Sequence, residues 1–578
     1  MRPPILALLA VASLSSVPAR ADRIDDVIQT EMKKRNIPGL SLAVVQDGKI
    51  VKATGYGTTE LGGTTPVAAT TLFQAGSISK PVSALAALRM VERGQLALDE
   101  DVNVRLVGWK VPDTELTRDN KVTLRRILSH TAGLTVHGFP GYAVGEPVPT
   151  LVQILDGEKP ANTAPIRVDV VPGTIQRYSG GGYIVLQKLM GDVTKRPFPE
   201  LMRKLVLEPA GMTHSTYAQP LPLDRAAATA SGFYADRSPV PGRWHVYPEM
   251  SAAGLWTTPS DLAMFAIEVQ RALAGKSRKV VSPAMARRFV TKEKEHAGLG
   301  IFLEGTGRTL RFSHNGRDEG FDAFLVACAE TGQAAAIMIN ANDNSRAAQR
   351  ILDAIAREYR WPADGQPQPA APAAVAVAPA ALERYAGRYE FSNNNMWTFM
   401  VHEGRLYTQA DGLPDDELVP VAADRFRTTD GALEIAFLGD AGATTGFAWT
   451  RGDKKGTAPR IGPLIHTFAP RADPDAALTG KVEAAIVAFA QGRNDAPELA
   501  AFSAGLRRDL RGPYRPLDGL ASLKFIAAED IAARGIERHD GKVARLVYYQ
   551  RVPDGRPRYV LVHVTVDGIV TDLDLVDD

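Results

Sequence analysis

The stretch Phe73-Gln74-Ala75-Gly76-Ser77-Ile78-Ser79-Lys80-Pro81 decides the fold class, and an apolar periodic segment follows it over residues 82–91. Proline is tolerated in the first turn of a helix, so Pro81 predicts a helix that begins at or near Ser77. Side chains three residues apart share one face of a helix, which places the Lys80 amine within reach of the Ser77 hydroxyl.

The pairing of Ser77 with Lys80 suits nucleophilic catalysis. A serine hydroxyl is a poor nucleophile at neutral pH, and a desolvated lysine with a lowered pKa can accept its proton. Backbone N–H groups at the helix start would stabilise an oxyanion. Ser-x-x-Lys alone is a weak signal, because about one serine in twenty has a lysine at this spacing by chance. Here it is the only match in the chain.

Four further stretches follow the Ser77 segment. They read ILSHTAGL over residues 127–134, YSGGGY over 178–183, AGLWTTPSDL over 253–262 and HNG over 314–316. Over residues 24–360 the five stretches together resemble the serine β-lactamase and penicillin-recognising superfamily, particularly class C β-lactamases, D-stereospecific peptidases and related esterases. The resemblance implies an α+β fold, in which an antiparallel sheet flanked by helices meets a mostly helical subdomain and the site lies between them.

The resemblance also implies a role for each matching position. Tyr178 corresponds to the tyrosine of the family's second element and would move protons, with Lys80, between Ser77 and the leaving group. His314 corresponds to the first position of the third element, which faces the substrate.

Gly316 and Arg317 complete the implied substrate site. Gly316 would let the substrate backbone approach closely. The backbone N–H of Arg317 would pair with that of Ser77 as the oxyanion hole, so the Arg317 side chain itself is not required.

Two positions depart from the β-lactamase pattern. Gly180 replaces the asparagine of the second element, whose amide helps to hold the substrate's acyl amide. His314 replaces the lysine that helps to bind the carboxylate of penicillins, and a neutral or weakly charged imidazole lowers the affinity for an acidic β-lactam. Both changes favour a peptidase or esterase, and slow β-lactam turnover stays open.

Other hydrolase and cofactor classes lack their signatures. The chain has no His-Glu-x-x-His or other tight ligand cluster, no Gly-x-Ser-x-Gly nucleophile elbow and no phosphate-binding loop. We therefore expect neither a metal nor another cofactor.

The beginning of the chain predicts export. Arg2 is followed by an apolar stretch over residues 5–14, and Ala19 and Ala21 give a small-x-small end. This pattern is typical of a secretory signal peptide that is cut after Ala21. The apolar stretch is shorter than the ~20 residues that span a bilayer. We expect a periplasmic or secreted protein without an integral membrane segment in the mature chain.

Composition divides the remaining chain. Residues 22–361 form the predicted serine hydrolase domain, and residues 362–381 are a Pro/Ala tract expected to act as an extended linker. Short alternating runs over residues 382–470 predict a small antiparallel barrel-like module. Residues 475–578 contain two helical stretches, 482–489 and 498–510, and three strand candidates, which predicts an α+β cone-like module.

Charge and cysteine content exclude several partners. The formal net charge of the 578 residues is +2, too balanced for a partner chosen by bulk charge, such as nucleic acid or an anionic membrane. Cys328 is the only cysteine, so no intrachain disulfide or thiolate metal cluster forms, and its apolar neighbours predict a buried strand position.

These observations predict an exported serine acyl hydrolase that forms an acyl-enzyme on Ser77 and cleaves amide or ester bonds of small substrates, such as short or D-residue peptides and small esters. Two alternatives stay open: a β-lactamase, and a slow-turnover penicillin-binding sensor or scaffold. A homo-oligomer or a cell-wall contact through the C-terminal modules also stays open.

Overall fold

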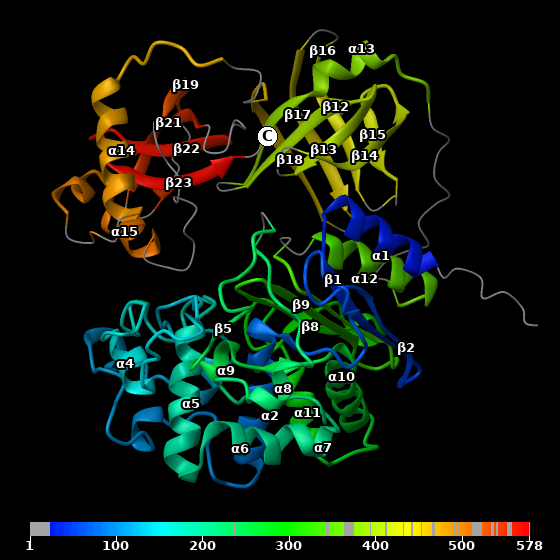
Figure 1. Cartoon of the computed structure of the whole chain (residues 1–578), viewed down its shortest axis with the longest axis vertical. Helices are drawn as coiled ribbons and strands as arrows, with labels where there is room; N and C mark the ends of the chain where they lie inside the picture. Colours follow the sequence, from blue (N-terminus) through cyan, green and yellow to red (C-terminus); the bar gives the residue numbers. More distant parts are fainter. Residues whose placement is uncertain are drawn as a thin grey trace, which may run out of the picture. The chain divides into compact units, whose positions relative to one another are not determined.

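The computed structural model describes residues 23–234, 237–342, 346–362, 375–392, 395–410, 413–429, 431, 433–440, 443–451, 454–464, 469–490, 493, 496–510, 523–532, 537–538, 541–551 and 558–576. The predicted signal peptide and residues 363–374 of the predicted linker lie outside these ranges. The chain divides after Pro362 into two compact units, which we call the N-terminal unit and the C-terminal unit (Figure 1).

The N-terminal unit is built on a six-stranded antiparallel sheet with the strand order β2-β1-β10-β9-β8-β7. The Asp47-Gly48 turn joins the first two strands, and both turn residues have positive φ, as a type I′ turn requires. Cys328 ends β9 and is buried, which confirms its predicted position. The strands are β1 (Gly39–Gln46), β2 (Lys49–Gly57), β7 (Phe302–Glu304), β8 (Arg311–Asp318), β9 (Phe321–Cys328) and β10 (Ala334–Ile339).

Helices cover both faces of this sheet. On one face α1 (Arg23–Lys34) and α12 (Arg346–Glu358) lie side by side, and they share a core with β1 and β10 (Figure 1). On the other face α10 (Pro259–Leu273) contacts the central strands. Because both faces are covered, β10 is buried at every residue and carries no polar alternation.

The helical part of the unit surrounds α2 (Ser79–Glu92), which is buried on nearly all sides. Small residues along α2 allow α9 (Met250–Ala253) to approach closely. The remaining helices of the unit are α3 (Leu124–Leu128), α4 (Leu151–Asp156), α5 (Gly180–Thr194), α6 (Phe198–Met202), α7 (Glu208–Ala210), α8 (Leu223–Ala226) and α11 (Pro283–Phe289). The predicted α+β class, with a flanked antiparallel sheet and a mostly helical part, is confirmed.

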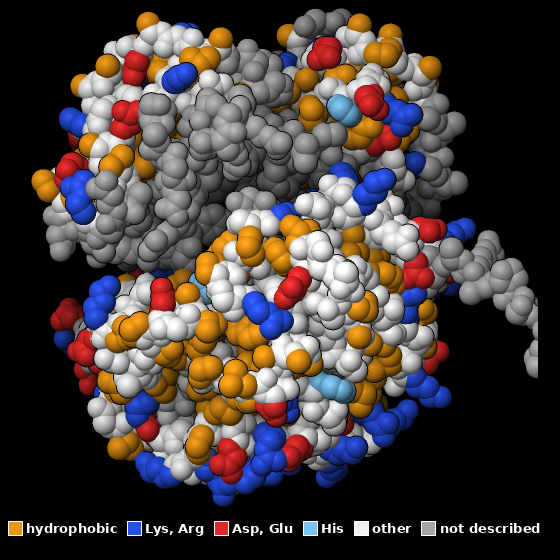
Figure 2. Space-filling model, in the orientation of Figure 1, with side chains coloured by type: hydrophobic (Ala, Val, Ile, Leu, Met, Phe, Trp, Pro, Cys, Tyr) orange, Lys and Arg blue, Asp and Glu red, His pale blue; other side chains and the backbone are white. Residues whose placement is uncertain are grey.

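Surface charges are mixed in sign over the visible face of the N-terminal unit (Figure 2). Near α6 and α7, for example, Glu200 forms ion pairs with both Arg196 and Lys204. Interspersed pairs of this kind do not create the single-sign field that attracts a polyanion.

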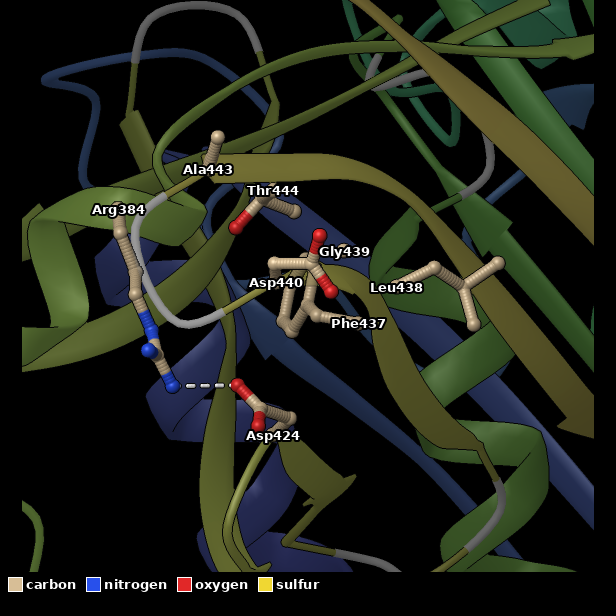
Figure 3. A pocket seen from close by; sticks show the side chains of 8 residues that line it. All are labelled: Arg384, Asp424, Phe437, Leu438, Gly439, Asp440, Ala443 and Thr444. Atoms are coloured by element: carbon tan, nitrogen blue, oxygen red, sulfur yellow. Dashed lines mark hydrogen bonds and ion pairs between the residues drawn. The ribbon is translucent and has the colours of Figure 1, made fainter.

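The C-terminal unit begins with a closed eight-stranded barrel whose core is largely aromatic. Its strands are β11 (Gly387–Ser392), β12 (Asn395–His402), β13 (Arg405–Ala410), β14 (Leu413–Ala422), β15 (Arg425–Thr428), β16 (Glu434–Asp440), β17 (Ala443–Arg451) and β18 (Lys454–Gly462). Figure 3 shows a small pocket around the Arg384–Asp424 ion pair. Its volume of ≈ 10 Å³, about the room that one water molecule needs, is far below the about 300–1,000 Å³ typical of ligand sites.

An antiparallel sheet with the order β19-β21-β22-β23 and two helices complete the C-terminal unit. The predicted helical stretch 498–510 is interrupted: a 3₁₀ helix over Pro497–Ala501 is followed by the separate helix α15. The interruption arises because Phe502 is extended and the Ser503 hydroxyl caps α15 by accepting the Leu506 N–H. The elements are α14 (Ala476–Ala490), α15 (Ala504–Leu510), β19 (Lys524–Asp530), β20 (Glu537–Arg538), β21 (Gly541–Arg551), β22 (Arg558–Thr565) and β23 (Val570–Val576).

A buried arginine links the barrel to this second sheet. The Arg388 guanidinium, on β11, donates to the Pro463 carbonyl at 2.8 Å, to the Tyr548 hydroxyl at 2.6 Å and to Glu529 Oε1 at 2.7 Å. Its side chain is 1% exposed. A buried cation that is this fully paired fixes the two modules of the C-terminal unit to each other.

Candidate active site

Ser77 lies in a tight turn between the two parts of the N-terminal unit. The short strand β3 (Phe73–Gln74) pairs with β6 (Trp256–Thr257), and a 3₁₀ turn over Gly76–Ile78 then leads directly into α2. Ser77 is partly exposed, whereas its neighbours on both sides are buried. A nucleophile at this position is accessible to a substrate and held on a rigid base.

Two glycines allow β8 to lie against this turn. A Cβ on Gly316 would stand 1.9 Å from the Ala75 carbonyl oxygen, and a Cβ on Gly76, whose φ is +50°, would stand 2.5 Å from the Arg317 nitrogen. Neither position tolerates a side chain. We predicted a close approach to substrate at Gly316; the close approach that the structure shows there is to the chain's own nucleophile turn.

Lys80 is a buried amine within hydrogen-bonding distance of Ser77. Its Nζ lies 2.9 Å from Ser77 Oγ and 2.9 Å from the Ala252 carbonyl oxygen. Burial lowers the pKa of Lys80 from 10.5 to about 7, although the nearby carboxyl of Asp318 opposes this shift. A substantial fraction of Lys80 is therefore neutral at physiological pH and able to accept a proton.

Tyr178 completes this group from the loop that precedes α5. The Lys80 Nζ lies 4.9 Å from the centroid of the Tyr178 ring. Burial raises the pKa of Tyr178 above 10.0, and a hydrogen bond with the Ser77 side chain opposes the shift only in part. The raised pKa means that Tyr178 is a neutral phenol at physiological pH, which suits the proton relay expected of it.

The backbone N–H of Arg317 points toward the Ser77 turn. Asp318 and Phe321 close the two-residue turn between β8 and β9, and the next pair, Arg317 opposite Asp322, is a non-hydrogen-bonded pair of an antiparallel ladder. Its N–H therefore points away from β9, to the side where Gly76 lies. The Arg317 side chain instead binds Asp322, with Nε 2.9 Å from Oδ1.

His314 is buried beside these groups and is neutral. Its Nδ1 donates to the Asn315 carbonyl oxygen at 2.6 Å, which leaves Nε2 as an acceptor. Burial, and then the charge of Lys80, lower the pKa of His314 to about 3. Nε2 is buried without a hydrogen-bond partner among the described residues.

Gly180 is closely packed at the start of α5. It is the first residue of α5, where the Ser179 side chain accepts the Gly182 N–H as the helix cap. A Cβ on Gly180 would lie 2.9 Å from both the His137 carbonyl oxygen and the Phe139 ring. The space that the family's asparagine side chain would need is thus filled by His137 and Phe139.

Two buried acids near the site were not predicted from the sequence. Asp318 Oδ2 accepts the Gly76 N–H at 3.2 Å. Burial raises the pKa of Asp318 well above 3.8 and that of Glu249 to about 8. Asp318 lies two residues after the third element, and this proximity could have marked it in the sequence as a candidate site residue. Glu249 carries no sequence signal.

The described part of the chain offers no group of three or more His, Cys, Asp or Glu side chains placed to hold a metal ion. In the same residues, no helix is both long and apolar enough to cross a membrane.

Comparisons with known proteins find relatives of this chain. The family model Beta-lactamase matches residues 24–360. Penicillin-binding protein 4 of Amycolatopsis lactamdurans is 26% identical over 330 residues, which cover 54% of this chain and 83% of that protein. Protein flp of Staphylococcus aureus (strain N315) is 26% identical over 247 residues, 43% of this chain and 46% of that protein. The match to Protein flp thus spans about half the length of that protein.

One solved structure extends the similarity beyond the family match. The octameric penicillin-binding protein homologue from Pyrococcus abyssi has a TM-score of 0.50 and 20% sequence identity, and the alignment covers 76% of this chain and 98% of that one. The aligned share exceeds what residues 24–360 supply, so part of the C-terminal unit shares the fold as well. The family match, which takes in Ser77, Lys80, Tyr178 and His314, shows that this chain belongs to the Beta-lactamase family of serine hydrolases.

Proposed function

We propose that this protein is an exported serine acyl hydrolase that cleaves ester or amide bonds of small substrates through an acyl-enzyme on Ser77. The observation that carries the proposal is the 2.9 Å separation of Lys80 Nζ and Ser77 Oγ, with the lysine buried and its pKa near 7. A neutral amine at this distance is a general base already in place for the serine hydroxyl.

In the proposed mechanism Lys80 accepts the Ser77 proton while Oγ attacks the carbonyl carbon. The N–H groups of Ser77 and Arg317 stabilise the oxyanion. Tyr178 donates its phenolic proton to the leaving alcohol or amine as the carbonyl–leaving-group bond breaks, and Lys80 returns a proton to Tyr178. Water then attacks the acyl-enzyme by the same route in reverse, which releases the acid and restores Ser77.

The site lacks two groups that help to bind penicillins. His314 is neutral and buried, so it offers no cation for the carboxylate of a penicillin. Gly180 offers no amide for an acyl amide group. We therefore propose small esters and short or D-residue peptides as substrates. Penicillin binding with slow turnover is the second candidate, because a relative similar over most of its length is named Penicillin-binding protein 4.

Export and assembly are also proposals. The pattern of residues 1–21 supports a cleaved signal and a periplasmic or secreted location. The structural neighbour from Pyrococcus abyssi is described as octameric, which makes self-association worth measuring by light scattering.

Intact-mass analysis with panels of esters, D-peptides and β-lactams separates the candidates. Rapid release of one class of product, with only transient adducts, supports the hydrolase. A long-lived β-lactam adduct without product would replace it with the penicillin-binding sensor. If neither adducts nor products formed in any panel, the proposed function would be wrong.

A further inference from the structure

A row of rings extends from the candidate nucleophile toward the surface of the N-terminal unit. The centroid of the Tyr178 ring is 6.1 Å from that of Phe302, which is in turn 4.9 Å from that of His296. On its other side Tyr178 lies 4.8 Å from His137. We call these four residues the ring row: His137, Tyr178, Phe302 and His296.

The ring row has a buried back and an accessible front. His130 and His314 are buried behind it, with ring centroids 4.4 Å from Tyr178 and 5.1 Å from Phe302 respectively. Tyr178 and Phe302 are half-buried, whereas the two ends of the row, His137 and His296, are exposed. Half-buried rings that are held in place by buried neighbours form a preorganised surface for a planar group.

The row is continuous with the reacting groups. Tyr178 is hydrogen-bonded to the Ser77 side chain. Phe302 begins β7 and pairs with Ser313 of β8, next to His314. A substrate whose carbonyl is attacked by Ser77 would therefore place one of its two substituents against Tyr178 and Phe302.

The chemistry of the row disfavours an anionic substituent. Burial lowers the pKa of His130 well below 6.5 and that of His314 to about 3, so both imidazoles behind the row are neutral at physiological pH. The neighbouring cation on β8, Arg317, is ion-paired with Asp322. The buried neighbours of the row are thus neutral imidazoles, and the Lys80 amine beside Tyr178 is held by Ser77 Oγ and the Ala252 carbonyl with its pKa lowered to about 7.

We propose that the ring row is a subsite for an uncharged aromatic group of the substrate, which stacks on Phe302 beside the scissile bond. This inference rests on the proposed acyl hydrolase function and names its substrate class. An aromatic pair of this kind contributes a preference of about 2- to 10-fold in kcat/KM over a saturated ring of the same size.

Matched esters test the subsite on both sides of the bond. One pair is p-nitrophenyl phenylacetate and p-nitrophenyl cyclohexylacetate, which differ only in the acyl ring. The other is benzyl acetate and cyclohexylmethyl acetate, which differ only in the alcohol. Because the cyclohexyl ring is the more hydrophobic of the two, a merely apolar pocket would prefer the saturated member.

We expect the full-length enzyme to prefer the aromatic member of at least one pair, and Phe302→Leu to remove that preference. Leucine keeps an apolar side chain on β7 but has no ring face. His296→Ala removes an exposed ring with little risk to folding, and should reduce the preference by a smaller factor. His214→Ala is the matched control, because His214 is also exposed and has no ring contact with the row. This control should leave the preference unchanged.

The outcomes separate the subsite from the function. A preference for the saturated member in both pairs, or an aromatic preference that survives in both Phe302→Leu and His296→Ala, would overturn the subsite while Ser77 still reacts with a fluorophosphonate probe. Failure of the probe to label Ser77 would overturn the proposed function, and the subsite with it.

Discussion

Lys80 in the N-terminal unit and Arg388 in the C-terminal unit are both buried cations, each with about 1% of its surface exposed, but their surroundings differ. The hydrogen-bonding neighbours of Lys80, Ser77 Oγ and the Ala252 carbonyl, are uncharged. Those of Arg388 include the carboxylate of Glu529. Burial opposes the charge at both sites.

The difference shows what decides the fate of a buried charge. Burial without a bound carboxylate lowers the pKa of Lys80 to about 7. At Arg388, burial is outweighed by Tyr548 and Glu529, and the pKa is raised. Lys80 is thus able to exchange a proton, whereas Arg388 stays charged and stabilises the structure. Each substitution below tests one side of this contrast.

Lys80→Met should give the largest effect. It removes the proposed base and puts an apolar side chain of similar length in its place, so kcat/KM for an ester should fall about 10²- to 10⁴-fold. Stability should stay unchanged or rise, because an amine without a bound carboxylate is removed from the interior. Ester hydrolysis and thermal unfolding measure the two effects.

The pH dependence of the unaltered enzyme is the control for Lys80. A base with a pKa of about 7 becomes available as the pH rises. The value of kcat/KM should therefore increase with pH below about 7 and level off above it. Activity of Lys80→Met within tenfold of the unaltered enzyme, or a flat profile from pH 5 to 8, would remove Lys80 from the mechanism.

Arg388→Met should have the opposite signature. It leaves Glu529 and the Tyr548 hydroxyl without their cation, which should destabilise the C-terminal unit by about 3–5 kcal/mol. Labelling of Ser77 by a fluorophosphonate should stay within about twofold, because Ser77 and Arg388 belong to different compact units of the chain. Urea unfolding monitored by fluorescence, or thermal unfolding in a calorimeter, measures the loss of stability.

An exposed arginine of the same barrel is the matched control for Arg388. Arg425 is 61% exposed and lies 3.7 Å from Glu434. Arg425→Met should change stability by no more than about 0.5 kcal/mol. Equal effects of the two substitutions would mean that pairing of the buried cation does not stabilise this unit.

Asp318 should give an intermediate effect, because its direct contact with the Ser77 turn is the hydrogen bond that it accepts from the Gly76 N–H. Asp318→Ala leaves this buried N–H without its acceptor, at a cost of about 1–3 kcal/mol, and should slow acylation about 5- to 100-fold. Asp318→Asn keeps an acceptor oxygen and should recover most of the rate. If alanine and asparagine behave alike, the hydrogen bond does not position the nucleophile turn.

Arg317→Lys should give the smallest effect. The proposed contribution of Arg317 is its backbone N–H, and lysine retains both that group and a cation near Asp322. We expect kcat within about threefold of the unaltered enzyme. A loss of more than tenfold would show that the guanidinium itself takes part in the reaction.

The sequence predicted the parts of the site that depend on local geometry. Helical spacing was sufficient to bring Lys80 to Ser77. The order of the family's elements added Tyr178 and His314. Each of these features lies within one helical turn or within one short stretch that matches the family.

The remainder depends on segments that are distant in the chain. The space beside Gly180 is filled by His137 and Phe139, which no local pattern reports. Phe302 joins the ring row because β7 pairs with β8, and its own segment carries no motif. The break in the predicted helix 498–510 depends on the Ser503 cap. The apolar periodicity favours one continuous helix and the serine hydroxyl favours a helix start, and periodicity alone does not show which prevails.

Covalent labelling identifies the nucleophile directly. The full-length protein would be treated with a fluorophosphonate probe, digested, and mapped by peptide mass spectrometry, with Ser77→Ala treated in parallel. We predict a single adduct on the peptide that contains Ser77 and none in Ser77→Ala. An adduct on another serine, or labelling that persists in Ser77→Ala, would contradict the assignment of Ser77 as the nucleophile.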